Sequence, residues 1–395
     1  MGRIRKYISE NSRVIGWSVL GVLLVSWLML YKLGNLTDGM SAAELSATSA
    51  AVGWHGIYQN VLYLPLNFIR SVIFALFTDH GLLLGRLPNA LFGALTIITF
   101  ACLIKVWHGT RTAVMATLLF ATSAWVLHVS RLASFDVMYL WTLPTLLLLH
   151  ALFNKHAKNP IVWFGSAIVW GCMLYIPGMI WLVLLSIYLL RSQIATGWRH
   201  FSRWWQRLGY LLLALAGLPL LVFNLAKFGG VTMWLGLPTE LSGPLILLKQ
   251  LAAVPVHMFV RGPRYPEVWL DSVPLLDIFS LAMCFVGIYF YATHIKASRT
   301  RLLGLFTVLG VLLVAIGGPV GLSLLVPVLY ITIATGIAYM MHDWLHVFPN
   351  NPLARGIGIG LISLAIGLSC LYNLRAYFVA WPHNPTTQAV FQYRP

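Results

Sequence analysis

The sequence predicts an all-α polytopic membrane protein, and three observations lead to this fold class. Hydrophobic residues make up 59% of the 395-residue chain, charged residues make up only 9%, and the mean hydropathy is +0.82. These values exceed what a soluble domain needs to fill its core. Apolar runs long enough to cross a bilayer as helices recur from one end of the chain to the other. Residues 1–395 are therefore expected to form one integral membrane domain.

About 11 apolar runs have the length and composition of membrane-spanning helices. They lie near 14–32, 82–106, 112–129, 135–153, 160–175, 178–191, 208–226, 275–293, 301–317, 321–341 and 353–372. The stretch 57–77 is also apolar, but Pro65, Asn67 and Arg70 within it favour a helix that lies at the membrane interface or re-enters. The connections 33–81 and 227–274 are long, and long ordered loops tend to carry function.

The net charge of +16 reflects membrane topology and not a nucleic-acid partner. Lysines and arginines gather in short loops between spans, as the positive-inside rule requires, and no RNA-binding motif accompanies them. Placing the N-terminus in the cytoplasm puts most of the 26 basic residues on the inner side of the plasma membrane. Most of the ten acidic residues then fall on the outer side. Chemistry that needs carboxylates is therefore expected at the outer face.

Three outer acidic residues are candidates for such chemistry, and each also has a structural explanation. "SAAE" (41–44) fits a helix capping box in which Ser41 is the N-cap and Glu44 reaches back to its amide. Asp38 precedes a glycine, a common turn pair. Asp136 stands in the first turn of an expected helix, where the helix dipole favours a carboxylate. Together they would supply the carboxylates that general-base chemistry at a membrane surface requires.

The order of several motifs resembles the GT-C class of membrane glycosyltransferases. The resemblance is to the branch of protein O-mannosyltransferases and aminoarabinose transferases, which is glycosyltransferase family 39-like. The segments that carry it are "SAAEL" (41–45), "YLPLNF" (63–68), "GRLPNALFGAL" (85–95) and "HVSRLASFDVMYL" (128–140). It covers residues 14–190 well and continues more loosely to the end. We expect a GT-C-like module over 14–225, followed by variable helices and an outer tail over 226–395.

This resemblance implies a GT-C-like bundle whose long first outer loop contains juxtamembrane helices. It also implies an enzyme that moves a sugar, with inversion, from a polyprenyl-phosphate carrier to a protein, lipid or glycan acceptor at the outer face. A carboxylate of the first outer loop would act as the base. The family's aspartate position is Ala43 here, so Glu44 is favoured by alignment, with Asp38 close behind and Asp136 as a further member.

Outer cations would stabilise the phosphate leaving group. The candidates for this role, which could instead be interfacial anchors, are Arg86, Arg131, Lys227, Lys249, Arg261 and Arg264. His55, His257 and His383 lie on the outer side and could assist, although lone histidines are usually only hydrogen-bonded. The polar tail "AWPHNPTTQAVFQYRP" could dock on the active face. His342 and His346 have a metal-compatible spacing but lie on the inner side, so no metal or other cofactor is expected.

Two other functions remain open from the sequence. A transporter or flippase of polar lipids would need charges inside the spans, which are nearly free of them. A catalytically inactive scaffold of the same fold would account for Ala43. Substitution of Glu44 or Asp38 separates these alternatives, because only a transferase should depend on either carboxylate.

Overall fold

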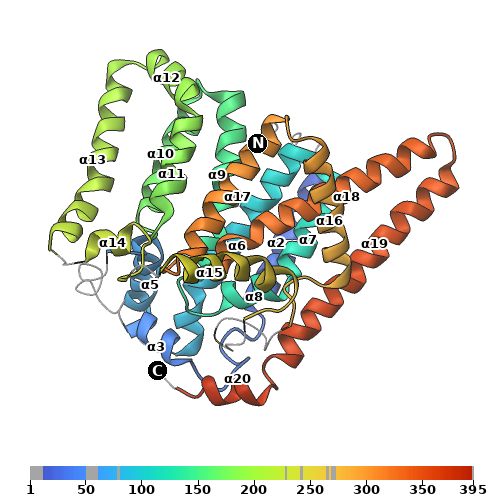
Figure 1. Ribbon diagram of the computed structural model, residues 1–395, viewed down its shortest axis with the longest axis horizontal. Coiled ribbons are helices and arrows are strands. Elements are labelled where there is room, and N and C mark those ends of the chain that lie inside the picture. The colour runs from blue at the N-terminus through green and yellow to red at the C-terminus, as the bar shows by residue number, and fades with distance from the viewer. Residues whose placement is uncertain are drawn as a thin grey trace.

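The computed structural model describes residues 12–49, 61–77, 81–226, 229–240, 243–263, 267 and 273–393. Within those residues the chain is helical and has no strand, apart from a single β-bridge between Met40 and Tyr393. The helices form a bundle, with the short helices that follow the first and last long helices gathered at one end of it (Figure 1). The all-α class predicted from hydropathy is confirmed.

The helices alternate between long apolar segments and short connecting ones. The first half comprises α2 (Ser12–Leu30), α3 (Ala42–Ser49), α5 (Leu64–Leu76), α6 (Leu82–His108), α7 (Thr110–Thr122), α8 (Ala124–Arg131), α9 (Asp136–His156), α10 (Pro160–Leu174), α11 (Met179–Leu189), α12 (Arg191–His200) and α13 (Arg203–Ala226). The second half comprises α14 (Gly230–Trp234), α15 (Pro244–Phe259), α16 (Ile278–Thr293), α17 (Ser298–Ala315), η1 (Leu322–Leu324), α18 (Val326–Val347), α19 (Pro352–Arg375), the π-helical turn η2 (Ala376–Ala380) and α20 (Pro385–Val390).

Five stretches in the described part of the chain are long and apolar enough to cross a membrane. They are α6, α9, α17, the stretch Leu322–Val347 and the stretch Pro352–Ala380. Two bent pairs, α7 with α8 and α11 with α12, raise the number to seven if each pair is one span. The expected number of about 11 spans is not confirmed, because several runs form helices shorter than a bilayer requires. α10, for example, has 15 residues.

The bend between α7 and α8 has a polar partner. The two helices differ in direction by 60°, and the break at Ser123 frees the main-chain N–H of Ala124. This N–H donates to Oδ1 of Asn373 on α19, at 3.3 Å. The amide of Asn373 in turn donates to Asp277, which caps the start of α16 by accepting from the N–H groups of Phe279 and Ser280. The broken span is therefore stabilised by side chains far away in the sequence.

The centre of the bundle is apolar and closely packed. α6 packs along α9, and α16 packs along α18. The last two helices cross through glycines: a Cβ at Gly287 would meet the carbonyl oxygen of Thr332, and a Cβ at Gly336 would meet that of Met283. Small residues at such crossings let helix backbones approach each other within a membrane.

Two connecting segments differ from a simple loop. The described part of the stretch 57–77 forms α5, with Pro65 in its first turn and Tyr63 in a left-handed conformation before it. The connection 227–274 contains α15, a 16-residue apolar helix that the sequence analysis does not anticipate. Many of its leucine and isoleucine side chains are exposed, as expected for a helix that faces lipid.

The glycine crossing gives a stability prediction. Gly336→Ala should lower the unfolding temperature in detergent, because the added methyl group overpacks the α16–α18 contact at a cost of about 1–3 kcal/mol. Gly360→Ala is the matched control on α19, because a Cβ there meets nothing within 4 Å. Equal unfolding temperatures for both variants would contradict the packing described here.

Candidate active site

Glu44 lies at the start of α3 and is held by its own helix terminus. The main-chain N–H of Ser41 donates to Oε2 of Glu44 at 3.3 Å, and the N–H of Glu44 donates to the hydroxyl of Ser41 at 3.2 Å. These reciprocal bonds are the capping box that "SAAE" suggests. The side chain of Glu44 is only 2% exposed, so the carboxylate also needs a partner from outside α3.

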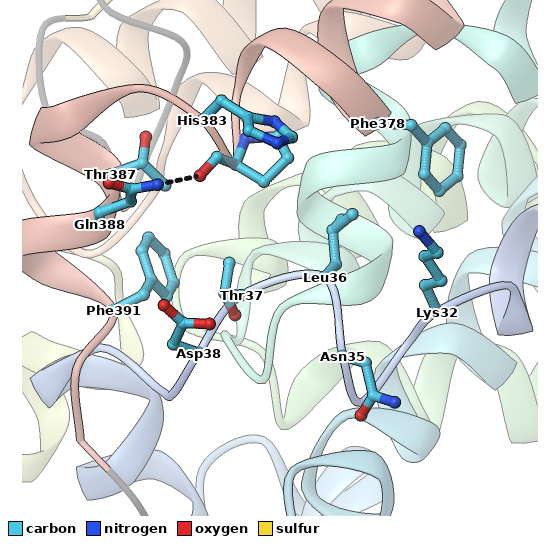
Figure 2. Close-up of a pocket in the computed structure, with 11 residues that line it drawn as sticks. Lys32, Asn35, Leu36, Thr37, Asp38, Phe378, His383, Thr387, Gln388 and Phe391 are labelled. Atoms are coloured by element: carbon cyan, nitrogen blue, oxygen red, sulfur yellow. Dashed lines mark hydrogen bonds between the residues drawn. The ribbon is translucent and has the colours of Figure 1, made fainter.

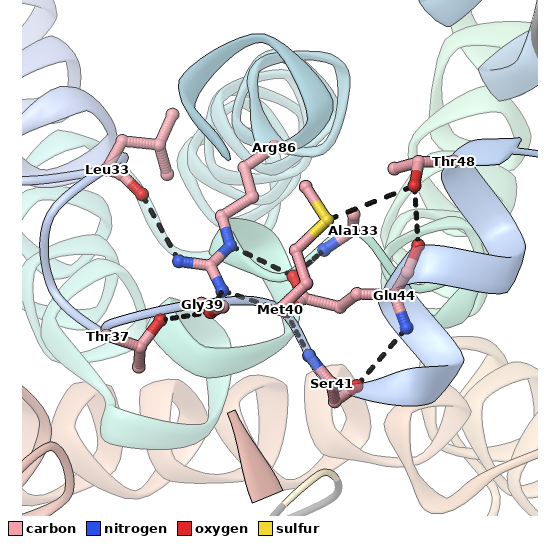
Figure 3. A network of polar contacts seen from close by, with 9 residues as sticks. All are labelled: Leu33, Thr37, Gly39, Met40, Ser41, Glu44, Thr48, Arg86 and Ala133. Atoms are coloured by element: carbon pink, nitrogen blue, oxygen red, sulfur yellow. Dashed lines mark hydrogen bonds and ion pairs between the residues drawn. The ribbon is translucent and has the colours of Figure 1, made fainter. Parts of the chain in front are cut away.

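That partner is Arg86 of α6 (Figure 3). Its Nε lies 3.0 Å from Oε1 of Glu44 and its Nη2 lies 2.8 Å from Oε2, a two-pronged ion pair. Oε1 also accepts the main-chain N–H of Ala133 at 2.7 Å. Glu44 thus joins α3, α6 and the turn that precedes α9. Its oxygens are occupied by four donors, and the pair is buried on both sides.

Arg86 also holds the loop between α2 and α3, which we call the first loop (residues 31–41). Its guanidinium donates to the carbonyl oxygens of Gly39, at 3.1 Å, and Leu33, at 3.4 Å. The donors predicted to bind phosphate are therefore used within the protein. This arrangement fixes the path of the backbone on both sides of Asp38.

Arg131, the second predicted phosphate ligand, has a similar arrangement. It is 1% exposed and donates to the carbonyl oxygens of Leu28 and Tyr31, at the end of α2. Its guanidinium also lies 4.9 Å from the ring centre of Phe378 in η2. Arg131 thus connects the end of the first helix to the C-terminal part of the chain.

Arg70 is a third buried arginine at this end of the bundle, and it is absent from the predicted site residues. It is fully buried in α5 and donates to the carbonyl oxygen of Ala47 at 2.7 Å and to Oδ1 of Asn89 at 3.0 Å. An arginine within an apolar stretch is itself a sign of buried partners. Among the described residues, Glu44 is the only acid that forms an ion pair with any of these three arginines. The three arginines together with Glu44 therefore carry an excess of positive charge.

Asp38 has a different environment. It lies in a pocket of about 260 Å³ between the first loop and the C-terminal segment, residues 376–393 (Figure 2). The polar residues that line the pocket include Lys32, Asn35, Thr37, Asp38, His383 and Gln388. The side chain of Asp38 is exposed and forms no hydrogen bond or ion pair with another described residue. Its carboxylate is therefore available to a ligand.

Asp136 lies apart from this pocket, at the first residue of α9. A Cβ added at Gly321 would lie 3.2 Å from its Oδ1, so the carboxylate packs against the start of η1. Tyr63 and Tyr139 are close by, with their hydroxyl oxygens 3.0 Å apart. Burial raises the pKa of Tyr63, and the nearby charge of Asp136 adds to the shift. The three predicted carboxylates are thus in three different settings.

The remaining predicted cations do not line the pocket. Arg261 follows α15 and is exposed; only its main chain is hydrogen-bonded, to Val256 and His257. Lys227 and Arg264 lie outside the described residues. Lys32, which does line the pocket, is absent from the sequence-based set because it reads as an ordinary basic residue at the end of a span.

No three metal-binding side chains come together in the part of the chain that the structure describes. Nδ1 of His342 lies 3.6 Å from Oδ1 of Asp343, and both side chains are exposed near the far end of α18. The expectation that the protein needs no cofactor stays a prediction.

Comparisons with known proteins support the resemblance found in the motifs. Residues 65–223 match the family model described as dolichyl-phosphate-mannose-protein mannosyltransferase. No curated protein matches the chain. The family matched is one of GT-C glycosyltransferases, and it covers the segments from α5 to α13.

Solved structures share the fold across the whole chain. ArnT from Cupriavidus metallidurans in the apo state has a TM-score of 0.54 at 13% identity, over 96% of this chain and 77% of that one. The same protein bound to undecaprenyl phosphate has a TM-score of 0.56 at 14% identity, over 95% of this chain and 77% of that one. The apo oligosaccharyltransferase of Archaeoglobus fulgidus gives 0.54 at 14% identity, over 95% of this chain and 56% of that one.

These findings identify the fold. The chain has the GT-C fold of integral membrane glycosyltransferases, and the resemblance to that class is confirmed. The matched family and the structural neighbours are both glycosyltransferases.

The buried ion pair gives a prediction that distinguishes a carboxylate that stabilises the fold from one that is free to react. Glu44→Gln should lower the free energy of unfolding by about 3–5 kcal/mol, because it leaves Arg86 buried without its counter-charge. Asp38→Asn, at an exposed carboxylate without a partner, should leave the unfolding temperature unchanged. Thermal unfolding of both variants in detergent tests this. A Glu44→Gln protein as stable as the wild type would overturn the structural role of the pair.

Proposed function

We propose that this protein is a glycosyltransferase that moves a sugar from a polyprenyl-phosphate-linked donor to an acceptor hydroxyl, with Asp38 as the base. The observation that carries the proposal is the contrast between the two carboxylates of the first loop and α3. Glu44 is buried and bound by four donors, whereas Asp38 is exposed in a polar pocket. A base must reach the hydroxyl proton that it removes, and of these two carboxylates only that of Asp38 is free to do so.

The reaction is a direct displacement at the anomeric carbon. Asp38 accepts the proton of the acceptor hydroxyl as its oxygen attacks that carbon. The bond between the anomeric carbon and the phosphate oxygen breaks, and its electron pair leaves with the lipid phosphate. Attack from the side opposite the phosphate inverts the configuration of the sugar.

The buried arginines favour a donor that carries a phosphate. Arg70, Arg86 and Arg131 are all buried, and of these three only Arg86 pairs with a carboxylate of the described residues, that of Glu44, so the excess charge attracts an anion to this end of the bundle. The N–H groups of these arginines donate to carbonyl oxygens of the protein. The arginines would therefore act on the phosphate through their electrostatic field and by positioning the first loop. The neighbours support a polyprenyl-phosphate donor, since one is bound to undecaprenyl phosphate and another to a dolichol-phosphate with an inhibitory peptide.

The site is proposed to face the outside of the membrane. α3 and α20 lie at one end of the bundle, and α12 lies at the other (Figure 1). The α12 end carries exposed arginines at 191, 199, 203 and 207. The positive-inside rule assigns that end to the cytoplasm, which leaves the pocket on the outer face.

Activity of Asp38→Asn tests the proposal. Sugar release or transfer from radiolabelled polyprenyl-phosphate sugars should fall about 100-fold or more, because the general base is lost. Asp343→Asn is the matched control, since its exposed carboxylate lies at the far end of α18 and should leave the rate unchanged.

Three results would count against the proposal. Full activity of Asp38→Asn would remove this residue from the reaction. Loss of activity only in Glu44→Gln, in protein that remains folded, would transfer the role of base to Glu44. No turnover with any donor, in the wild type as in the variants, would favour a polar-lipid transporter or an inactive scaffold.

A further inference from the structure

The pocket around Asp38 has a second wall, made by the C-terminal segment. The N–H of Met40 donates to the carbonyl oxygen of Tyr393 at 2.6 Å, and the N–H of Tyr393 donates to that of Met40 at 3.1 Å. Gly39 permits this close approach, because a Cβ at that position would meet the main chain of Gln392 and Tyr393. The C-terminal segment is thus joined to the first loop at Met40, two residues after Asp38.

Buried aromatic residues hold this wall in place. Trp381 is 1% exposed and stacks on Tyr377, with ring centres 5.4 Å apart and planes 9° from parallel. The ring of Phe391 meets Trp381 edge-on at 5.2 Å, and the ring of His128 does so at 5.0 Å. The π-helical turn η2, a feature frequent at functional sites, contains Tyr377 and directly precedes Trp381. The segment is therefore a fixed part of the structure.

The wall presents defined hydrogen-bonding groups to the pocket. Nδ1 of His383 lies 2.7 Å from the carbonyl oxygen of Val379. A carbonyl oxygen can only accept, so Nδ1 carries the proton, and Nε2 of the neutral ring is an acceptor. The amide nitrogen of Gln388 makes one long bond, of 3.4 Å, to the carbonyl oxygen of Pro382, and its oxygen is open. Phe378 and Phe391 supply apolar surface beside these groups.

The first loop places opposite charges at two ends of the same pocket. Figure 2 shows the ammonium group of Lys32 near Phe378 and the carboxylate of Asp38 near Phe391. An inverting displacement needs its base and its leaving phosphate on opposite sides of the sugar ring. The pocket, at about 260 Å³, lies below the range of roughly 300–1,000 Å³ that drug-sized ligands occupy. Its size suits one small ring.

We propose that this pocket binds the sugar ring on which the enzyme acts, and that His383 and Gln388 recognise its hydroxyl groups. The inference rests on the proposed function, and it adds the C-terminal segment to the site. Lys32 faces the phosphate and Asp38 faces the acceptor hydroxyl, so the ring between them is that of the donor. An acceptor that is itself a sugar offers the same chemistry, and the experiment distinguishes the two sources.

The experiment measures binding, so that it does not depend on turnover. The full chain in detergent is titrated with undecaprenyl-phosphate mannose, with undecaprenyl-phosphate glucose and with sugar-free undecaprenyl phosphate. For His383→Ala and Gln388→Ala the Kd of a sugar-bearing lipid should rise about five- to tenfold, the effect of one lost hydrogen bond. The Kd of the sugar-free lipid should stay the same. His342→Ala, an exposed histidine at the far end of α18, is the matched control.

The unfolding temperature is measured alongside, and both variants should keep it because the two side chains are exposed. A higher KM for methyl glycoside acceptors, with donor binding unchanged, would support a sugar pocket filled by the acceptor. Equal weakening of all three lipids, or no change with any lipid or glycoside, would overturn the inference. If Asp38→Asn nevertheless abolishes transfer, the proposed function is supported and only the sugar pocket is wrong. Selective binding of the sugar-bearing lipids without any turnover would support the sugar pocket and count against the proposed function.

Discussion

The ion pair between Glu44 and Arg86 is the interaction on which this end of the molecule depends. It is buried on both sides, and it joins the first loop, α3, α6 and the turn before α9. A buried charge without its partner is costly, so these segments can pack only when the pair forms. The pair also fixes the carbonyl group of Gly39, next to Asp38. The position of the Asp38 carboxylate thus depends on the ion pair that Glu44 forms with Arg86.

The site combines distant parts of the chain through a few long side chains. Arg131 caps the end of α2 and lies over Phe378, which lines the pocket from the C-terminal side. The bridge between Met40 and Tyr393 joins the two walls of this pocket two residues beyond Asp38 and Phe391. The carboxylate of Glu44 and the guanidinium groups of Arg86 and Arg131 thus have structural roles, whereas the carboxylate of Asp38 has no partner among the described residues. This division of roles is how a membrane protein can keep a reactive group exposed inside a well-ordered site.

Much of the fold can be predicted from the sequence, because a bilayer imposes simple rules on composition. Hydropathy alone predicts the class and the longer spans, and "SAAE" predicts the cap of α3. The number of spans is harder, since the break before Ala124 depends on Asn373 of a distant helix. The site was less predictable still. Arg86 and Arg131 are visible as charges, but their carbonyl partners leave no trace in the sequence, and nothing local links His383 to Asp38.

The most direct test of this account is a cryo-electron microscopy structure of the full chain with an undecaprenyl-phosphate sugar bound. The account predicts a sugar ring between Asp38 and His383, with Glu44 still paired to Arg86. A ring bound against the carboxylate of Glu44, with Arg86 turned away from it toward the phosphate, would contradict the account.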